Sequence, residues 1–166
     1  MTTFTLVHVV LSLIGIGSGL VILYGLLRGK RMESGTVLFL TTTAARSLTG
    51  FGIPFHQLLP SHVVGVISLV VLAAASFARY ARHLAGAWRA TYVIGAVVAL
   101  DLNVFVLIVQ LFRKVPALRA LAPTQTEAPF VVTQLAALVV FVVAGIFAVQ
   151  RFQVGVPHIE GVPKAA

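Results

Sequence analysis

The residues best suited to carry out chemistry are an arginine and an aspartate within apolar segments. Arg46 lies in the stretch TTTAARSLTGFGIPFH, and Asp101 lies in a long run of Val, Leu and Ala residues. A charge at the centre of a bilayer costs at least about 2.5 to 3.5 kcal/mol, so each of these side chains needs a partner. Both lie near the middle of their segments, which predicts a matched depth and an ion pair between Arg46 and Asp101.

This pair has two interpretations. As a structural clamp, it would fix the register of two helices. As a functional group, Asp101 would titrate, or Arg46 would hold an anionic substrate or a quinone carbonyl. Asn103 and Gln110 share a helical face opposite Asp101, which predicts a central helix shielded from lipid on both faces. The residues expected to assist the pair or to line a polar path are Thr42, Thr43, Ser47, Thr49, Asn103 and Gln110.

Three histidines, His8, His56 and His62, are expected together at the outer membrane boundary. Neutral imidazole is a common ligand for haem iron, zinc and copper. Gly15 and Gly19 have the G-x-x-x-G spacing that lets a helix or a flat ring approach closely. We therefore hypothesise a haem b or metal site with His8 and His62 as axial ligands, and with His56 either supporting these ligands or acting as a proton relay. The alternative is that the histidines only meet interfacial water and that the glycines only pack helices.

The composition is that of a membrane protein. The 166 residues are 59% hydrophobic and 10% charged, with a mean hydropathy of +1.04. A soluble domain carries about 25% charged residues. The net charge of +8 does not indicate nucleic-acid binding, because most basic residues lie between apolar runs, where they would face lipid headgroups. The absence of cysteine excludes disulfides and thiolate metal sites.

Five segments are long enough to cross a bilayer, since a span needs about 20 mostly apolar residues. The sequence thus predicts an all-α bundle of five transmembrane helices over residues 1–152, followed by a flexible cytoplasmic tail over residues 153–166. Most Lys and Arg residues lie in connections on one side of the membrane. The positive-inside tendency therefore predicts an N-terminus outside and a C-terminus in the cytoplasm, for a protein of the bacterial inner membrane. The expected helices cover residues 4–27, 35–55, 61–80, 90–112 and 130–151, with a short interfacial helix at 115–121.

The segment SLTGFGIPFHQLLPSHVVGVISLVVLAAASFARYARHLAGAWRATYVI resembles the middle of a group of small multi-span inner-membrane proteins of proteobacteria that carry no assigned activity. The chain is also loosely similar to small b-type cytochrome membrane subunits. That second resemblance implies a bundle around a histidine-ligated haem. The inner side offers only His83, so the resemblance implies one outer haem and not two.

Three functions follow from these features. The favoured one is a small redox or quinone- or haem-handling membrane subunit that uses His8, His62, Arg46 and Asp101. The second is a proton-coupled transporter or channel in which Asp101 titrates. The third is a non-catalytic subunit that binds a membrane partner. The expected partners are membrane lipid and either further copies of the chain or a larger membrane complex, with no nucleic acid.

Overall fold

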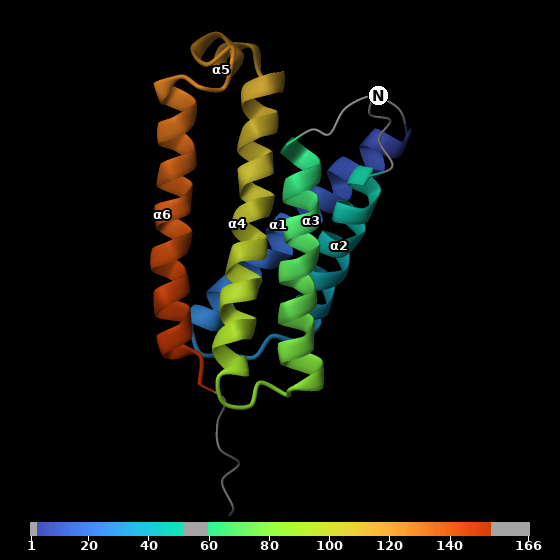
Figure 1. Cartoon of the computed structure of the whole chain (residues 1–166), viewed down its shortest axis with the longest axis vertical. Coiled ribbons are helices and arrows are strands. Elements are labelled where there is room, and N and C mark those ends of the chain that lie inside the picture. Colours follow the sequence, from blue (N-terminus) through green and yellow to red (C-terminus); the bar gives the residue numbers. More distant parts are fainter. Residues whose placement is uncertain (1–2, 52–59, 154–166) are drawn as a thin grey trace, which may run out of the picture.

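The computed structural model describes residues 3–51 and 60–153, and within these ranges all regular structure is helical. In Figure 1 the long helices lie side by side, and a short helix lies at the top of the bundle. The elements are α1 (Thr3–Leu27), α2 (Glu33–Phe51), α3 (Pro60–Ser76), the π-helical turn η1 (Phe77–Ala81), α4 (Trp88–Lys114), α5 (Pro116–Leu121) and α6 (Ala128–Arg151). The all-α class expected from the sequence is confirmed, while the expected tail lies almost entirely outside the described residues.

Four helices in the described part of the chain are long and apolar enough to cross a membrane. They cover Leu6–Leu27, Val63–Ala81, Trp88–Lys114 and Ala128–Arg151. The remaining long helix, α2, has 19 residues and carries charged and hydroxyl side chains, so it is less apolar than the other long helices. It nevertheless packs against both α1 and α3.

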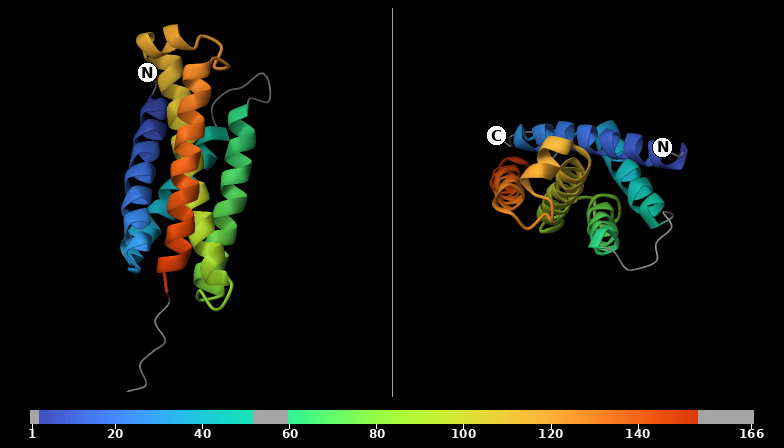
Figure 2. Two further views of the ribbon diagram at one scale, coloured as in Figure 1. Left: turned by 90° about the vertical axis from the view of Figure 1, so that its left-hand side faces the viewer. Right: turned by 90° about the horizontal axis from the view of Figure 1, so that it is seen from above.

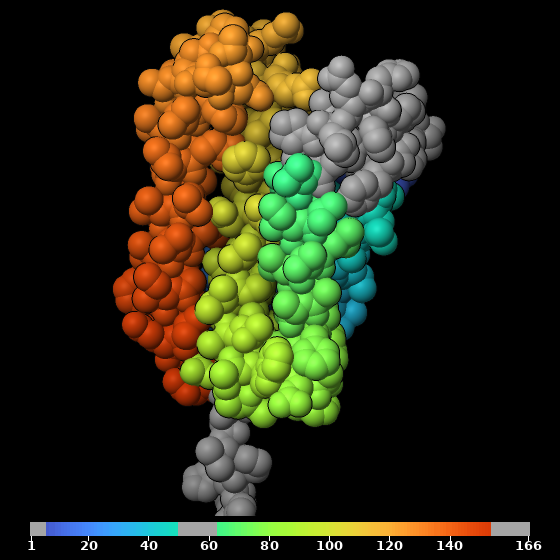
Figure 3. Space-filling view, in the orientation of Figure 1, coloured from blue at the N-terminus to red at the C-terminus, as the bar shows by residue number. Residues whose placement is uncertain are grey.

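Helix α4 lies at the centre of the bundle. It packs against α1, α3 and α6, and Figure 2 shows it from above between α6 and α3, with α1 along one side. This confirms the expectation of a central fourth helix. Helix α6 packs against α4 and α1, and it stands beside α4 along the face shown in Figure 3.

The approach of α1 to its neighbours depends on a glycine. A Cβ atom on Gly19 would lie 2.6 Å from Leu100 Cδ1 and 2.8 Å from Phe39 Cε2. Both of these neighbours are fully buried, so they have no space into which to move. At Gly15 a Cβ atom would lie 3.3 Å from Thr43 Oγ1. These two glycines therefore let α1 pack directly against α2 and α4.

Polar contacts connect α6 to α4 on both sides of their midpoints. Near the C-terminus of α6, Arg89 Nη1 donates to the carbonyl oxygen of Val149 at 2.9 Å and also to that of Phe152. A cation there offsets the partial negative charge of a helix C-terminus. Toward the other end, Gln134 Nε2 donates to the carbonyl oxygen of Phe105 at 3.2 Å.

The two ends of the bundle differ in charge. We call the end at which α1, α3 and α6 finish, lower in Figure 1, the basic end. The cationic residues of this end are Arg28, Lys30, Arg31, Arg79, Arg82, Arg89 and Arg151, whereas the opposite end carries Arg113, Lys114 and Arg119.

Candidate functional site

Arg46 of α2 is buried and is bound by an amide of α4. Its side chain is 8% exposed, and its Nη1 atom donates to Asn103 Oδ1. The amide nitrogen of Asn103 in turn donates to Thr43 Oγ1 at 3.1 Å. An amide can accept and donate at once, so Asn103 joins the arginine and the hydroxyl in one network.

The expected ion pair between Arg46 and Asp101 is wrong. Successive residues of an α-helix turn by about 100°, so positions 101 and 103 face nearly opposite directions from α4. Asn103 faces α2, whereas Asp101 lies in a groove beside α6. Within the described ranges, the one salt bridge joins Arg79 and Glu33.

His8 belongs to the periphery of the Arg46 network. Its Nδ1 atom lies 3.1 Å from Thr49 Oγ1, and the Thr49 hydroxyl donates to the carbonyl oxygen of Arg46 at 3.0 Å. A hydroxyl has one hydrogen, so while Thr49 donates to this carbonyl its oxygen can only accept from Nδ1 of His8. Thr42 instead donates to Leu38 of its own helix at 2.6 Å.

The other residues expected at the outer boundary contribute no described contact. His56 lies outside the described residues, and the structure describes no side chain for His62. Gln110 is half-buried on α4. In the described part of the chain no group of three or more His, Asp or Glu residues could hold a metal. The haem b or metal site therefore stays a prediction.

Asp101 lines a groove of about 420 Å³ between α4 and α6. Asp101 is its only acidic lining residue, and Gln150 is the only other polar one. A Cβ atom on Gly145 would lie 3.4 Å from Val97 Cγ1, so α6 lies close to α4 at this glycine. The apolar walls include Ile94, Val98, Leu138, Phe141 and Val142. We call this feature the α4–α6 groove.

The α4–α6 groove leads from the basic end toward the middle of α4. Gln150 lies in the last turn of α6, whereas Asp101 lies near the midpoint of α4. Asp101 is half-buried and forms no salt bridge with any described residue. An apolar cleft with one convergent polar group is the usual form of a small-molecule site, and a carboxyl there can donate, accept or exchange a proton.

Sequence reasoning identified Asp101 but missed the groove around it. Ile94, Val98 and Asp101 recur at helical spacing, which signals one shared face of α4. The matching face of α6 carries Gly145, but nothing in the sequence says that these two faces meet. The groove depends on which helices become neighbours, and only the structure provides that information.

Comparison with known proteins finds no relative of this chain. The resemblances to small inner-membrane proteins and to b-type cytochrome subunits therefore stay predictions. No protein-family model, no curated protein and no solved structure matches the sequence or the fold.

Proposed function

We propose that this protein is a five-span protein of the bacterial inner membrane that binds a quinone-class ligand in the α4–α6 groove. The observation that carries the proposal is the position of Asp101 as the only acidic group among the described residues that line a mostly apolar groove. A quinone combines a flat apolar ring, an apolar tail and two carbonyl oxygens. Its ring and tail match the apolar walls, and a carbonyl oxygen matches the carboxyl group.

The groove residues have distinct roles in this proposal. A protonated Asp101 donates a hydrogen bond to a quinone carbonyl, and an ionised Asp101 accepts one from a quinol hydroxyl. Phe141 offers an aromatic ring against which the ligand ring can pack. The volume of about 420 Å³ lies within the range of about 300 to 1,000 Å³ that small-molecule sites have. The rest of a long tail would lie in surrounding lipid.

The fifth span in this proposal is α2. Helices α1 and α3 both run toward the basic end in Figure 1, so the chain between them must return to the opposite end. Helix α2 makes that return, and its buried Arg46 is bound by Asn103 inside the bundle. The positive-inside tendency then puts the basic end in the cytoplasm and the N-terminus outside.

A matched pair of groove variants tests the proposal. Val142 lines the α4–α6 groove, and Val140 faces a different groove on the other side of α6. Both side chains are exposed and lie on one helix. In quinone-free nanodiscs, Val142→Trp should weaken binding of a radiolabelled short-chain quinone at least tenfold because the indole fills the groove. Val140→Trp should bind as the wild type does, and equal losses in the two variants would contradict the assignment.

The role of Asp101 is tested through pH. Quinone binding to the wild type should weaken as pH rises, because the ionised carboxyl no longer donates a hydrogen bond. Asp101→Asn should remove this dependence, since an amide donates at every pH. Asp101→Leu should weaken binding by about fivefold at low pH, the equivalent of one hydrogen bond of about 1 kcal/mol. A wild-type affinity that does not change with pH would refute the role of Asp101.

A second function has independent support from α6. This helix exposes large apolar side chains on several faces, among them Val132, Val139, Val140 and Ile146. That exposure suits a non-catalytic subunit that binds a membrane partner, and co-purification with a larger complex would favour it over quinone binding. The transporter alternative has less support, because Asn103 is bound to Arg46 and lies on the opposite side of α4 from Asp101.

A further inference from the structure

A second pocket lies at the basic end, between the start of α2 and η1. Its volume is about 230 Å³. This is several times the volume of about 30 Å³ that a water molecule occupies in the liquid. Its lining residues are Arg31, Glu33, Arg79, Tyr80, His83 and Leu84. We call it the basic-end pocket; it shares no residue with the α4–α6 groove.

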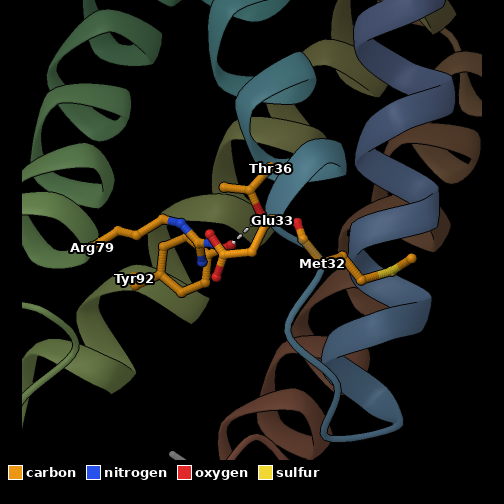
Figure 4. Close-up of polar contacts among 5 residues, drawn as sticks. All are labelled: Met32, Glu33, Thr36, Arg79 and Tyr92. Atoms are coloured by element: carbon orange, nitrogen blue, oxygen red, sulfur yellow. Dashed lines mark hydrogen bonds and ion pairs between the residues drawn. The ribbon is translucent and has the colours of Figure 1, made fainter.

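Arg79 is the buried cation of this pocket. Its side chain is 5% exposed, and Figure 4 shows it extending from η1 toward Glu33 and Tyr92. The Arg79 Cζ atom lies 5.1 Å from the centroid of the Tyr92 ring, and the Tyr92 hydroxyl lies 3.0 Å from Thr36 Oγ1. The aromatic ring and its hydroxyl partner therefore fix the position of the guanidinium.

The carboxylate beside Arg79 is a weak partner. Glu33 Oε2 lies 2.9 Å from Arg79 Nη2, but the Glu33 side chain is 71% exposed. This contact lacks hydrogen-bond geometry, so the buried Nη2 atom has no hydrogen-bond acceptor among the described residues. Water and salt around the exposed Glu33 carboxylate screen its attraction to the buried guanidinium. Arg79 thus keeps a donor that a better-placed anion could use.

The backbone turn after η1 brings a further donor to the pocket. His83 and Leu84 have φ angles of 49° and 61°, a left-handed conformation that is uncommon outside glycine. Such strained residues cluster at ligand sites. The π-helical turn η1 that precedes them is also a form found often at functional sites. The turn places His83 on the pocket wall with Arg31 and Arg79.

We propose that the basic-end pocket binds a phosphate group, with Arg31 and Arg79 as the cationic donors and His83 as the third donor. Two guanidinium groups against one carboxylate leave the pocket positive, and Arg28, Lys30 and Arg82 add to the positive charge of this end. Guanidinium groups form strong charge-assisted hydrogen bonds with phosphate oxygens. Basic pockets between helices at the cytoplasmic boundary suit anionic lipid headgroups.

The test measures lipid binding to the full-length protein after it is delipidated in an uncharged detergent. Phosphatidylglycerol should bind and raise the thermal midpoint, whereas phosphatidylcholine should not. Arg31→Gln and His83→Gln both change exposed side chains, and each should weaken phosphatidylglycerol binding at least fivefold. Arg119→Gln, an exposed arginine of α5 at the opposite end, is the matched control and should bind as the wild type does.

A second experiment with inorganic phosphate identifies the source of the phosphate group. Inorganic phosphate that binds alone and displaces the lipid would indicate a soluble phosphate compound as ligand. Lipid binding that resists phosphate would indicate a headgroup. Both results support the pocket, provided that the Arg31 and His83 variants weaken the binding.

Glu33→Gln provides the sharpest result. Removing this carboxylate frees Arg79 for the ligand, so phosphatidylglycerol should bind at least threefold more tightly even though the variant changes an exposed side chain. Weaker binding in Glu33→Gln would overturn the proposal. So would wild-type binding in both Arg31→Gln and His83→Gln, or an equal loss in Arg119→Gln.

Discussion

At the scale of single residues, Asn103 is the side chain on which the buried charge of the bundle depends. Its amide accepts from Arg46 and donates to Thr43, so it joins α4 to two polar side chains of α2. A neutral amide does not cancel the charge of Arg46. It does replace the water that a guanidinium would lose inside the bundle, which lowers the cost of burial.

Replacing Asn103 should destabilise the bundle more than replacing Asp101. Asn103→Ala leaves Arg46 without its acceptor and should lower the free energy of unfolding by about 1.5 to 3 kcal/mol, the range for hydrogen bonds to charged groups. Asp101→Asn should change it by less than about 1 kcal/mol, because Asp101 forms no described salt bridge. Denaturant titration in bicelles measures both. An ion pair between Arg46 and Asp101 would give the reverse order.

The error in pairing Arg46 has a physical origin. The depth of a residue along its helix can be estimated from the sequence, and this estimate correctly predicted that Arg46 lies near the centre of α4. The direction of each side chain around its helix requires knowledge of which neighbour each face meets. Asp101 and Asn103 are two positions apart, so a depth estimate cannot separate them, and electrostatics favoured the acid over the amide.

At the scale of elements, the sequence predicted the helices within a few residues. The expected ranges 4–27 and 130–151 compare with Thr3–Leu27 and Ala128–Arg151 in the structure. The short helix expected at 115–121 is present as α5. Polar and proline-containing breaks determine these limits. The π-helical turn η1 was not predicted, because no residue in FARYA distinguishes it from a continued α-helix.

Two glycines of α1 should respond to alanine in opposite directions. Gly19→Ala places a methyl group against Leu100 and Phe39, so it should destabilise the protein by about 1 to 3 kcal/mol through overpacking. Gly17→Ala has no atom within 4 Å of the added carbon. It should stabilise the helix by up to about 1 kcal/mol. Thermal unfolding of the two variants in one detergent makes the comparison, and equal shifts would argue against close packing at Gly19.

At the scale of the whole molecule, the proposed five-span arrangement makes the two ends face opposite compartments. The chain contains no cysteine, so single cysteines can report the sidedness of each loop. Lys30, Ala85 and Ala120 are all exposed, the first two at the basic end and the third on α5 at the opposite end.

Labelling with a membrane-impermeant maleimide should separate five spans from four. Lys30→Cys and Ala85→Cys should react from the cytoplasmic side, because α2 and α3 together return the chain to that side. Ala120→Cys should react only from the outside. If α2 does not cross the membrane, Lys30→Cys and Ala85→Cys will label from opposite sides, and the five-span arrangement fails.

The connections between α4 and α6 determine how a ligand would reach the groove between them. Arg89 holds the helices together near one end, and Gln134 holds them together past Asp101 toward the other. Between these two points no described side-chain hydrogen bond joins α4 to α6, so separating the helices there breaks apolar contacts only among the described residues. A ligand would then enter sideways from the bilayer, so its rate of arrival would depend on diffusion in two dimensions and on how fluid the lipid is.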